Sequence, residues 1–420
     1  MDAFVKAVSS NNTSQVSELL ARDLQLKDRI NDPAGPFDSP AIIHVRSREM
    51  LDLLLNAGAN INGRSKWWAG SFGLLDTINP DLAAYAMERG AIVDVHSAAR
   101  LGMIEKLKDL IAEDPARVHS RGGDGQTPLH FAKTTEIAKF LLDHGAEMDA
   151  LDVDHESTPA QHMVRDRQEI VRFLVERGCK TDLLMAAAIG DERLVRKHLD
   201  ADPDAVRIRV SEEYFPKKNP RSGGMIYQWT LGAHLSAHDV AKQFGHDRIF
   251  ALLMERSPAD IQLLAACWNG EDAIVKNLVA RSPEVAAKVA IAYGGQLPNA
   301  ARSNNVPAVR LMLEIGASID ARGQHGATAL HWASFHGNLE MARELLRRNA
   351  PLEAIDNDFK LTPIGWAVYG SENGWYCRTG RFPETVDALL QAGATPPKKL
   401  SGTDAVKGVL RRNGVTEAAS

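Results

Sequence analysis

The sequence has few cysteines, no long apolar run and no strong excess of charge of either sign. Its 420 residues include three cysteines, far apart and without a CxxC pair, so neither disulfides nor a cysteine zinc site is expected. No run of about 18 or more apolar residues is present to span a bilayer, and the N-terminal segment does not resemble a signal peptide. A net charge of -5 gives no general attraction to nucleic acid or anionic lipid. These absences predict a soluble, cytoplasmic protein without membrane contact.

A Gly-Ala dipeptide, or a close relative of it, recurs along the chain at nearly constant spacing. The interval is 32 residues between the first two copies, and 33 between the third and fourth and between the fifth and sixth. Such a period is the mark of a repeat architecture in which each unit stacks on the next. The copies are Gly58-Ala59, Gly90-Ala91, Gly145-Ala146, Gly178-Cys179, Gly316-Ala317, Asn349-Ala350 and Gly393-Ala394.

Residues 323–350 carry the clearest copy of the repeat. Thr328 predicts a helix start, because its hydroxyl can satisfy a backbone N–H of the first turn, and Gly337 predicts the end of that helix. Asn338 then predicts the cap of a second helix with one apolar face, and Asn349 a left-handed turn that closes the unit. Two short helices with exposed apolar faces cannot be stable alone, so the pattern predicts stacked neighbours.

Residues 328–333, TALHWA, resemble the Thr-Pro-Leu-His-x-Ala signature of the ankyrin-repeat family, whose period is about 33 residues. Related hexapeptides begin at Thr127 and Thr362, and a shorter copy begins at Thr158. The resemblance implies an all-α solenoid of about twelve helix–turn–helix units with short β-type fingers. It also implies a hydrogen bond between neighbouring repeats from each signature histidine.

By this resemblance, residues 1–420 form a single continuous ankyrin-repeat array of the long kind found in bacteria. Residues 398–420 are interpreted as a C-terminal cap and tail. Two units lack the usual end of their first helix, close to His44 and Ala132, so a truncated first helix is expected in each.

Two insertions interrupt the repeat pattern. In residues 204–230, Val206, Ile208 and Val210 alternate with arginines, which is the periodicity of a strand. We interpret this segment as an inserted β-hairpin, with an irregular loop as the alternative. The second insertion, residues 370–382, is expected to be a loop between the two helices of the last full unit.

Tryptophans at equivalent places in successive units favour a recognition surface in the C-terminal repeats. The resemblance implies that first helices and fingers, Phe359 among the finger residues, line a concave groove that contacts partners. We therefore expect a non-enzymatic scaffold that binds a protein or peptide there, since tryptophan and arginine dominate interface energies. Packing between repeats is the alternative explanation for the tryptophans. The candidate partner-binding residues are Arg322, Gln324, His325, Trp332, Phe335, His336, Asn357, Asp358, Trp366, Trp375 and Tyr376.

A pocket is the alternative function: the two insertions would close the groove around a small molecule. His336 and Asp358 would then be the acid–base candidates of an enzyme, although no known constellation supports them. His234 and His238 are four residues apart but need not share a face, so no metal and no cofactor is expected. The basic stretch around Lys217 suggests contact with nucleic acid, which the net negative charge opposes.

Overall fold

The computed structural model describes residues 2–23 and 25–416. The interpretations of residues 1–420 as one array and of 398–420 as cap and tail extend to residues 1, 24 and 417–420, which lie outside the described residues. The contacts divide the chain into two compact units. Unit 1 comprises Met1–Met185 and Val210–Leu231, and unit 2 comprises Ala186–Arg209 and Gly232–Ser420.

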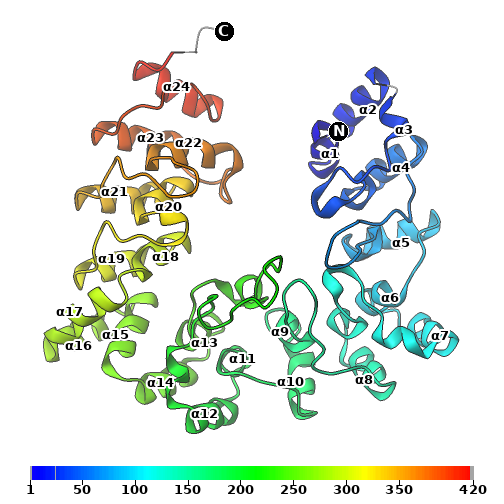
Figure 1. Ribbon diagram of the computed structural model, residues 1–420, viewed down its shortest axis with the longest axis horizontal. Coiled ribbons are helices and arrows are strands. Elements are labelled where there is room, and N and C mark those ends of the chain that lie inside the picture. The colour runs from blue at the N-terminus through cyan, green and yellow to red at the C-terminus, as the bar shows by residue number, and fades with distance from the viewer. Residues whose placement is uncertain (1, 24, 417–420) are drawn as a thin grey trace. The chain divides into compact units, whose positions relative to one another are not determined.

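Short helices account for almost all regular structure in both units, and successive helices run back along one another as pairs (Figure 1). No β-strand occurs within residues 2–23 and 25–416, where the pairing of extended backbone is limited to two isolated bridges, Gly35 with Ser39 and Arg209 with Ser236. No helix in this part of the chain is long and apolar enough to cross a membrane.

Within its described residues, unit 1 contains ten complete α-helices and six 3-10 turns. The α-helices are α1 Asp2–Ser9, α2 Thr13–Arg22, α3 Gln25–Asp28, α4 Arg48–Asn56, α5 Pro80–Glu88, α6 Val95–Leu101, α7 Ile104–Glu113, α8 Thr135–Asp143, α9 Pro159–Met163 and α10 Gln168–Glu176. The 3-10 turns are η1 Pro36–Asp38, η2 Ala41–His44, η3 Leu74–Asp76, η4 Pro115–His119, η5 Gly123–Gly125 and η6 Pro128–Phe131.

Helix α11 (Leu183–Ile189) and the π-turn η8 (Gln228–Gly232) cross the division between the units. The remaining elements belong to unit 2. They are α12 Glu192–Ala201, η7 Pro203–Arg207, α13 Ala237–Gln243, α14 Asp247–Arg256, α15 Ala259–Trp268, α16 Asp272–Arg281, α17 Pro283–Ala292, α18 Gln296–Arg302, α19 Val306–Glu314, η9 Gln324–Gly326, α20 Ala329–Phe335, α21 Leu339–Arg347, α22 Pro363–Asn373, α23 Phe382–Gln391 and α24 Asp404–Arg412.

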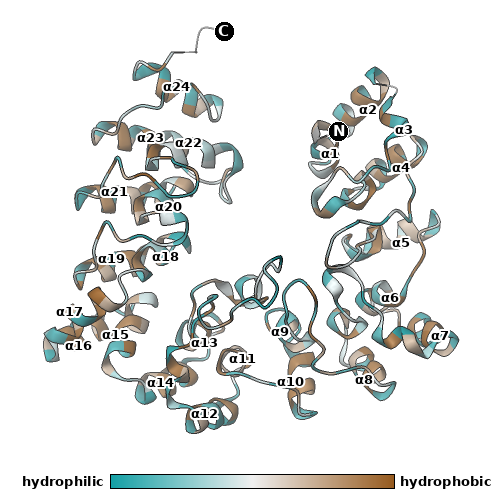
Figure 2. Cartoon of the chain, viewed as in Figure 1, coloured by the Kyte–Doolittle hydropathy of each residue, from teal (hydrophilic) through white to brown (hydrophobic). Residues whose placement is uncertain are grey.

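Apolar side chains buried between stacked helices form the cores. Brown, hydrophobic helix faces in Figure 2 alternate with teal, hydrophilic ones on the same helices, the pattern of amphipathic helices that cover a core. In unit 2 one apolar cluster extends from Leu263 to Val415. Ala333, Ala342 and Ala367 are fully buried within it, and such small side chains let neighbouring helices approach closely.

The helix positions predicted for residues 323–350 are confirmed, but the Thr328 hydroxyl lies 2.9 Å from the His331 ring Nδ1 and forms no cap hydrogen bond with the first turn. Helices α20 and α21 lie where they were expected, and the Asn338 side chain accepts a hydrogen bond from the Met341 backbone N–H at 2.9 Å. Gly337 and Asn349 have φ values of 61° and 58°, in the left-handed region. The signature histidines also behave as the resemblance implies. The ring Nε2 of His331 donates to the carbonyl oxygen of Leu361 in the next repeat at 3.2 Å.

The two truncated first helices are confirmed as well. The signature segments at η2 and η6 form single 3-10 turns of four residues, whereas α20 has seven. The fingers expected to be of β type contain no strand in the described residues. They are tight turns, closed in one case by the Gly323 backbone N–H donating to the Ala327 carbonyl oxygen at 3.0 Å.

The expected β-hairpin at residues 204–230 is wrong. Asp202 accepts a hydrogen bond from the Asp204 backbone N–H and starts the 3-10 turn η7, so Val206 lies in a helical turn rather than a strand. Further along, Tyr227 is buried and its hydroxyl donates to Asp182 at 2.9 Å in unit 1. Residues 210–230 therefore fold as an irregular segment onto unit 1, whereas residues 204–209 belong to unit 2, and the insertion is not a β-hairpin.

The insertion at residues 370–382 is partly helical. Helix α22 continues through its first part to Asn373, and a turn follows before α23 begins at Phe382. The turn is fastened to the preceding repeat, because the Arg381 backbone N–H donates to the Gly337 carbonyl oxygen at 2.8 Å.

Candidate functional site

Eight ring side chains of unit 2 form one connected aromatic cluster. They come from the finger around η9, from α20, from the next finger, and from α22 and the turn after it. Each ring has at least one neighbour in the cluster with centroids 5.0–6.4 Å apart, within or close to the usual range for interacting aromatic rings. The eight rings are those of His325, Trp332, Phe335, His336, Phe359, Trp366, Trp375 and Tyr376, and the ring of the buried signature residue His331 also contacts that of Trp366, with centroids 5.3 Å apart.

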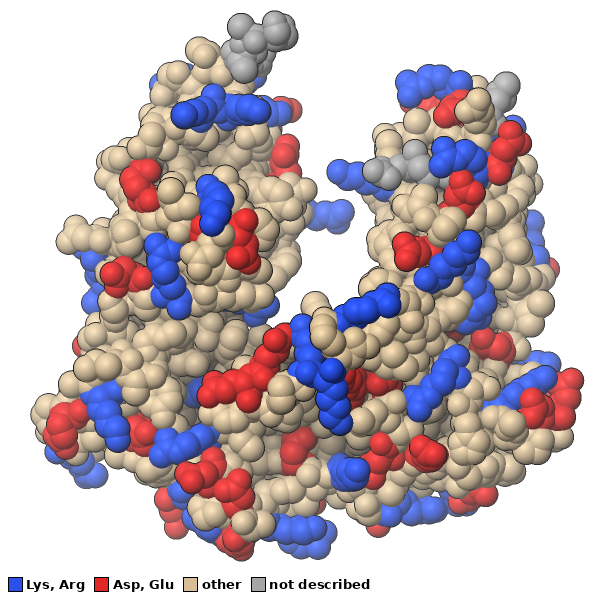
Figure 3. Space-filling model, in the orientation of Figure 1, with Lys and Arg blue, Asp and Glu red and all other residues tan. Residues whose placement is uncertain are grey.

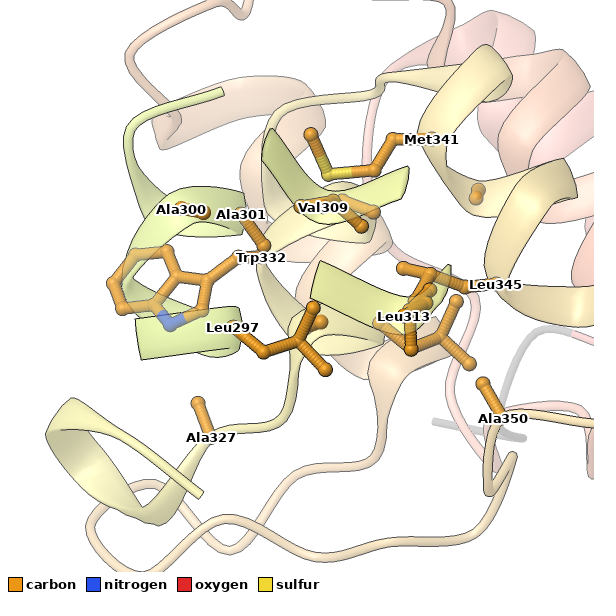
Figure 4. Packing of buried hydrophobic residues seen from close by; sticks show 14 of the residues in the cluster. Leu297, Ala300, Ala301, Val309, Leu313, Ala327, Trp332, Met341, Leu345 and Ala350 are labelled. Carbon is orange, nitrogen blue, oxygen red and sulfur yellow. The ribbon is translucent and has the colours of Figure 1, made fainter. Parts of the chain in front are cut away.

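Two tryptophans from successive repeats lie at the centre of the aromatic cluster. The rings of Trp332 and Trp366 meet edge to face, with centroids 5.0 Å apart and planes at 84°. The expectation that equivalent positions would make them neighbours is confirmed. They are only 4% and 5% exposed, and Figure 4 draws Trp332 with Leu297 and Ala300 of α18, the helix against which α20 packs. Both indoles therefore contribute chiefly to packing between repeats.

Trp375 forms the exposed part of the cluster. Its ring stacks on that of Trp332, with centroids 6.0 Å apart and planes at 26°, and the residue is 60% exposed. The guanidinium of Arg302 lies 5.4 Å from the Trp375 ring and 5.6 Å from the Trp332 ring, in the range of a cation–π contact. Burial lowers the pKa of Arg302. Trp375 is thus positioned by contacts on one face and open to solvent on the other.

Two glycines allow the turn that carries Trp375 to lie close to α20. A Cβ atom on Gly370 would lie 2.5 Å from the Phe335 carbonyl oxygen, and one on Gly374 would lie 2.9 Å from the same atom. Both distances are shorter than any side chain can adopt without moving the backbone. The lack of a side chain at these two positions therefore permits the approach that places Trp375 over Trp332.

The two acid–base candidates of the pocket hypothesis have different partners. His336 is 2% exposed, and its Nε2–H donates to the Arg302 carbonyl oxygen at 2.9 Å. Burial lowers the pKa of His336 to about 4, so the ring is neutral at pH 7. Asp358 instead accepts from His325 Nδ1 at 2.7 Å. These contacts give His336 a structural role and do not join it to Asp358.

The other predicted finger residues divide between structure and surface. Arg322 donates through Nη1 to the carbonyl oxygens of Gly326 and Ile355, each at 2.7 Å, and so ties two fingers together. Gln324 and Asn357 are exposed beside it. Sequence reasoning missed Arg302, although it lies one repeat, 33 residues, before Phe335 and could have been found from that spacing.

Two basic side chains of the 204–230 insertion, Lys217 and Arg221, already have partners within unit 1. Lys217 Nζ lies 2.7 Å from Glu212 Oε1, and the Arg221 guanidinium lies 4.5 Å from the Trp68 ring centroid. On the face of each unit that Figure 3 shows, blue basic and red acidic residues are interspersed. This face carries no broad basic surface of the kind that binds a phosphate backbone.

Two groups of histidine and aspartate side chains in unit 1 bring their ligand atoms within 4.8 Å of one another. One is His130, Asp152 and His162, and the other is Asp124, Asp154 and His155. Sequence reasoning missed both, because each combines residues from two repeats, about 30 positions apart. The signal that was available is the run Asp-x-Asp-His at residues 152–155.

The chain belongs to the ankyrin-repeat family. A family description of ankyrin repeats in three copies matches residues 95–185, 263–358 and 297–399, which together make up more than half of the chain. The architecture is accordingly an all-α helical solenoid, and repeats of this family indicate a protein–protein interaction role.

Curated relatives share the repeats but are longer proteins. The chain is 28% identical over 251 residues to the Protein VAPYRIN-LIKE of Medicago truncatula, a match that covers 59% of this chain and 50% of that protein. It is 29% identical over 135 residues to the rat Ankyrin repeat and SAM domain-containing protein 6, covering 31% and 15% respectively. It is 21% identical over 295 residues to the Arabidopsis thaliana E3 ubiquitin-protein ligase KEG, covering 64% and 18%. The chain thus spans half or less of the length of these relatives.

Proposed function

We propose that the protein is a non-enzymatic scaffold that binds a protein or peptide on the exposed side of the aromatic cluster in its C-terminal repeats. The observation that carries this proposal is Trp375, a solvent-exposed tryptophan stacked on a buried one. The contact surface would comprise Trp375, Phe359 and Tyr376 together with the polar finger residues Arg322 and Asn357. In this proposal the partner contacts the residues that cover Trp332 and Trp366, rather than these two buried tryptophans themselves.

The rings that a partner would contact are supported from below. Phe359 is 58% exposed and lies 5.2 Å from the His325 ring, while Trp375 rests on Trp332, Phe335 and His336. A side chain whose rotamer is already held loses little conformational entropy when a partner binds. Rigid, amphipathic aromatic side chains of this kind supply most of the energy of typical interfaces.

Polar groups beside the rings define the chemistry of the partner. Arg322 and Gln324 are exposed, and the carboxylate of Asp358 is 56% exposed although it is paired with His325. A partner would place an apolar side chain against Trp375 or Phe359 and satisfy the finger groups with backbone amides. This combination of an apolar centre and a polar rim is usual for protein interfaces.

The proposal is tested by affinity purification from the native cells with the wild type, a Trp375→Ala/Phe359→Ala double variant and Trp229→Ala. Trp229 is a matched control, since it is a 69% exposed tryptophan in unit 1. A captured protein is then purified and its Kd is measured against all three. We expect the double variant to bind at least 10-fold more weakly, about 1.4 kcal/mol, with an unchanged unfolding midpoint, and the control to bind as the wild type does. Equal Kd values for all three folded proteins would refute the proposed surface.

We propose further that the chain forms one array of about twelve units, with a C-terminal cap and tail at residues 398–420. We also propose that the protein is located in the cytoplasm. The location is supported by the three cysteines, which are all free, with Cys377 exposed. Free exposed thiols persist in reducing compartments. Fractionation of the native cells, with the redox state of Cys377 measured by thiol labelling, tests the location.

A further inference from the structure

Two pairs of neighbouring fingers, one in each unit, share the same backbone but carry different side chains. In unit 1 the fingers precede Thr127 and Thr158, and in unit 2 they precede Thr328 and Thr362. Each pair is tied by an equivalent arginine: Arg121 Nη1 donates to the Gly125 and Leu151 carbonyl oxygens at 2.7 and 2.6 Å, as Arg322 does in unit 2. Unit 2 is therefore an internal reference for unit 1.

In unit 2 the two aspartates of the second finger, Asp356 and Asp358, each accept a hydrogen bond from a side chain. Asp358 accepts from the His325 ring at 2.7 Å, and Asp356 accepts from the Trp366 indole at 2.9 Å. Counted from the signature threonines, unit 1 keeps both carboxylates as Asp152 and Asp154, but three of the ring side chains around them in unit 2 are replaced. The substituted pairs are Asp124 in place of His325, His155 in place of Phe359 and His162 in place of Trp366.

The replacement of His325 by Asp124 removes one donor and leaves the carboxylates of Asp124 and Asp154 facing one another, whereas His162 takes the place of the Trp366 indole beside Asp152. Asp124 Oδ1 and His162 Nε2 are buried, and neither has a hydrogen-bond partner among the described residues. The His162 side chain is only 8% exposed, its Nε2 lies 3.4 Å from Asp152 Oδ1, and its ring centroid is 5.9 Å from that of His155. Buried polar atoms are normally satisfied, so the unsatisfied Asp124 oxygen beside the Asp154 carboxylate indicates a missing positive group.

The side-chain ligand atoms of three residues, Asp124, Asp154 and His155, lie close to one another. His155 Nδ1–H donates to the Gly224 carbonyl oxygen at 2.9 Å, which leaves the lone pair of Nε2 directed toward Asp154 Oδ2, 3.7 Å away. Ligand atoms of Asp124, Asp154 and His155 all lie within 4.8 Å of one another.

The neighbouring donors are insufficient to balance this charge. The Arg121 guanidinium is directed at backbone carbonyls. The Trp67 indole is a further donor near Asp124, but a single neutral N–H does not balance the charge of two facing carboxylates.

We propose that Asp124, Asp154 and His155 bind a divalent transition-metal ion such as Zn²⁺. One imidazole and two carboxylates are ligands that such ions accept, with a water molecule completing a four-coordinate site. The hydrogen bond from His155 Nδ1 to a backbone carbonyl is the support that metal-binding histidines usually have. It fixes the tautomer that presents Nε2 to the ion.

The ion would fasten the insertion to the fingers of unit 1. Gly223 donates its backbone N–H to Asp154 Oδ1 at 3.0 Å, and Ser222 Oγ donates to the Asp154 carbonyl oxygen. Residues 210–231 thus already surround two of the three ligands. A cleft of about 280 Å³ lies beside the site, lined by His155, Glu156, Phe215 and Lys218 among others. Metal binding would therefore stabilise the wall of this cleft.

The test uses the full chain, stripped with chelator and titrated with Zn²⁺ and with Mn²⁺ by calorimetry. We expect one Zn²⁺ per wild-type chain. In the Asp124→Asn and His155→Phe variants binding should be at least about 100-fold weaker, since loss of an outer partner alone costs roughly 10–100-fold. His155→Phe copies the residue found in unit 2 and so remains compatible with the fold. The control, Asp358→Asn, removes the unit 2 carboxylate that corresponds to Asp154 and should bind Zn²⁺ as the wild type does.

A second readout follows the insertion itself. Trypsin cleavage after Lys218 and Arg221 should be slowed by Zn²⁺ in the wild type and in Asp358→Asn, and should be unaffected by Zn²⁺ in the two site variants. Absence of stoichiometric binding, or equal binding by the wild type and Asp124→Asn, would overturn the proposal. So would an Asp124→Asn chain that is more stable than the wild type with and without Zn²⁺, because the carboxylates would then merely share a proton.

Discussion

Replacement of Asp356 by alanine should destabilise the finger that carries Phe359 and Asp358. The Asp356 carboxylate is 1% exposed and accepts four hydrogen bonds. Three come from backbone N–H groups within the finger, at 2.6–2.9 Å, and the fourth from the Trp366 indole at 2.9 Å. Removing one acceptor would therefore leave four donors unpaired at once.

The size of the effect depends on which donors water can reach. Trp366 is 5% exposed, so its N–H would incur most of the ~1–3 kcal/mol cost of an unsatisfied buried donor. The three backbone N–H groups belong to exposed residues, and water can replace part of their bonds at a cost of about 0.5–1 kcal/mol each. We expect the Asp356→Ala chain to lose roughly 3–5 kcal/mol of the free energy of unfolding of the C-terminal repeats.

The assay is urea unfolding followed by tryptophan fluorescence, to which the three indoles of the aromatic cluster contribute. Asp358→Ala is the matched control, because its carboxylate is 56% exposed and forms a surface pair with His325; surface pairs contribute about 0–1 kcal/mol. If Asp356→Ala and Asp358→Ala lowered the free energy of unfolding equally, the argument from the four donors would be refuted.

The same carboxylate predicts a pH dependence. Burial alone would raise the pKa of Asp356, but the Trp366 indole and the backbone N–H groups outweigh it and hold the pKa below its ordinary value of 3.8. A carboxyl whose pKa is lower in the folded state stabilises the fold above its unfolded pKa, and this contribution is lost as pH falls through the folded value. The difference in stability between wild type and Asp356→Ala should therefore shrink below about pH 4, as measured by urea unfolding at stepwise lower pH.

Two further predictions concern the packing beneath the proposed binding surface. Gly370→Val should lower the unfolding midpoint and expose Trp332 to quenchers, because its Cβ would lie 2.5 Å from the Phe335 carbonyl oxygen; an unchanged midpoint would contradict the close approach. The pKa of His336 is lowered to about 4 by burial, so the unfolded chain takes up a proton between pH 6.5 and 4 that the folded chain refuses, and stability falls over that window. His336→Gln should show a smaller loss of stability between pH 6.5 and 4 than the wild type, measured by thermal unfolding.

The features that could be predicted from the sequence are those set by one repeat. Thr328, Gly337 and Asn338 act on their own turns, so the helix boundaries at residues 328–350 followed from local chemistry. The neighbourhood of Trp332 and Trp366 followed from the period, because equivalent positions of stacked repeats must form a column.

The features that could not be predicted depend on packing at a distance. The alternation at Val206, Ile208 and Val210 is typical of a strand, yet Asp202 and the following proline start a 3-10 turn. Asp114 and Pro115 start η4 in the same way. The sequence also did not show which tryptophans are exposed. The exposure of Trp375 and the burial of Trp332 depend on the turn after α22, whose path is permitted by Gly370. The His/Asp groups of unit 1 escaped notice because their members lie on two different fingers.

The two finger pairs show how one repeat backbone can carry different chemistry. Its hydrogen bonds are the same in both units: an arginine ties two fingers, a signature histidine bonds the next repeat, and an aspartate collects the backbone N–H groups of its turn. Because these contacts hold the fold, the side chains at the finger tip and early in the next first helix are free to vary. With histidine, phenylalanine and tryptophan there, the tips form an aromatic surface with balanced charge. With aspartate and two histidines there, the same geometry brings carboxylate and imidazole ligand atoms close together, as a cation-binding site requires. The proposed metal site of unit 1 and the aromatic surface of unit 2 thus depend on these three variable positions, together with Asp154 and Trp375, rather than on the repeat signature.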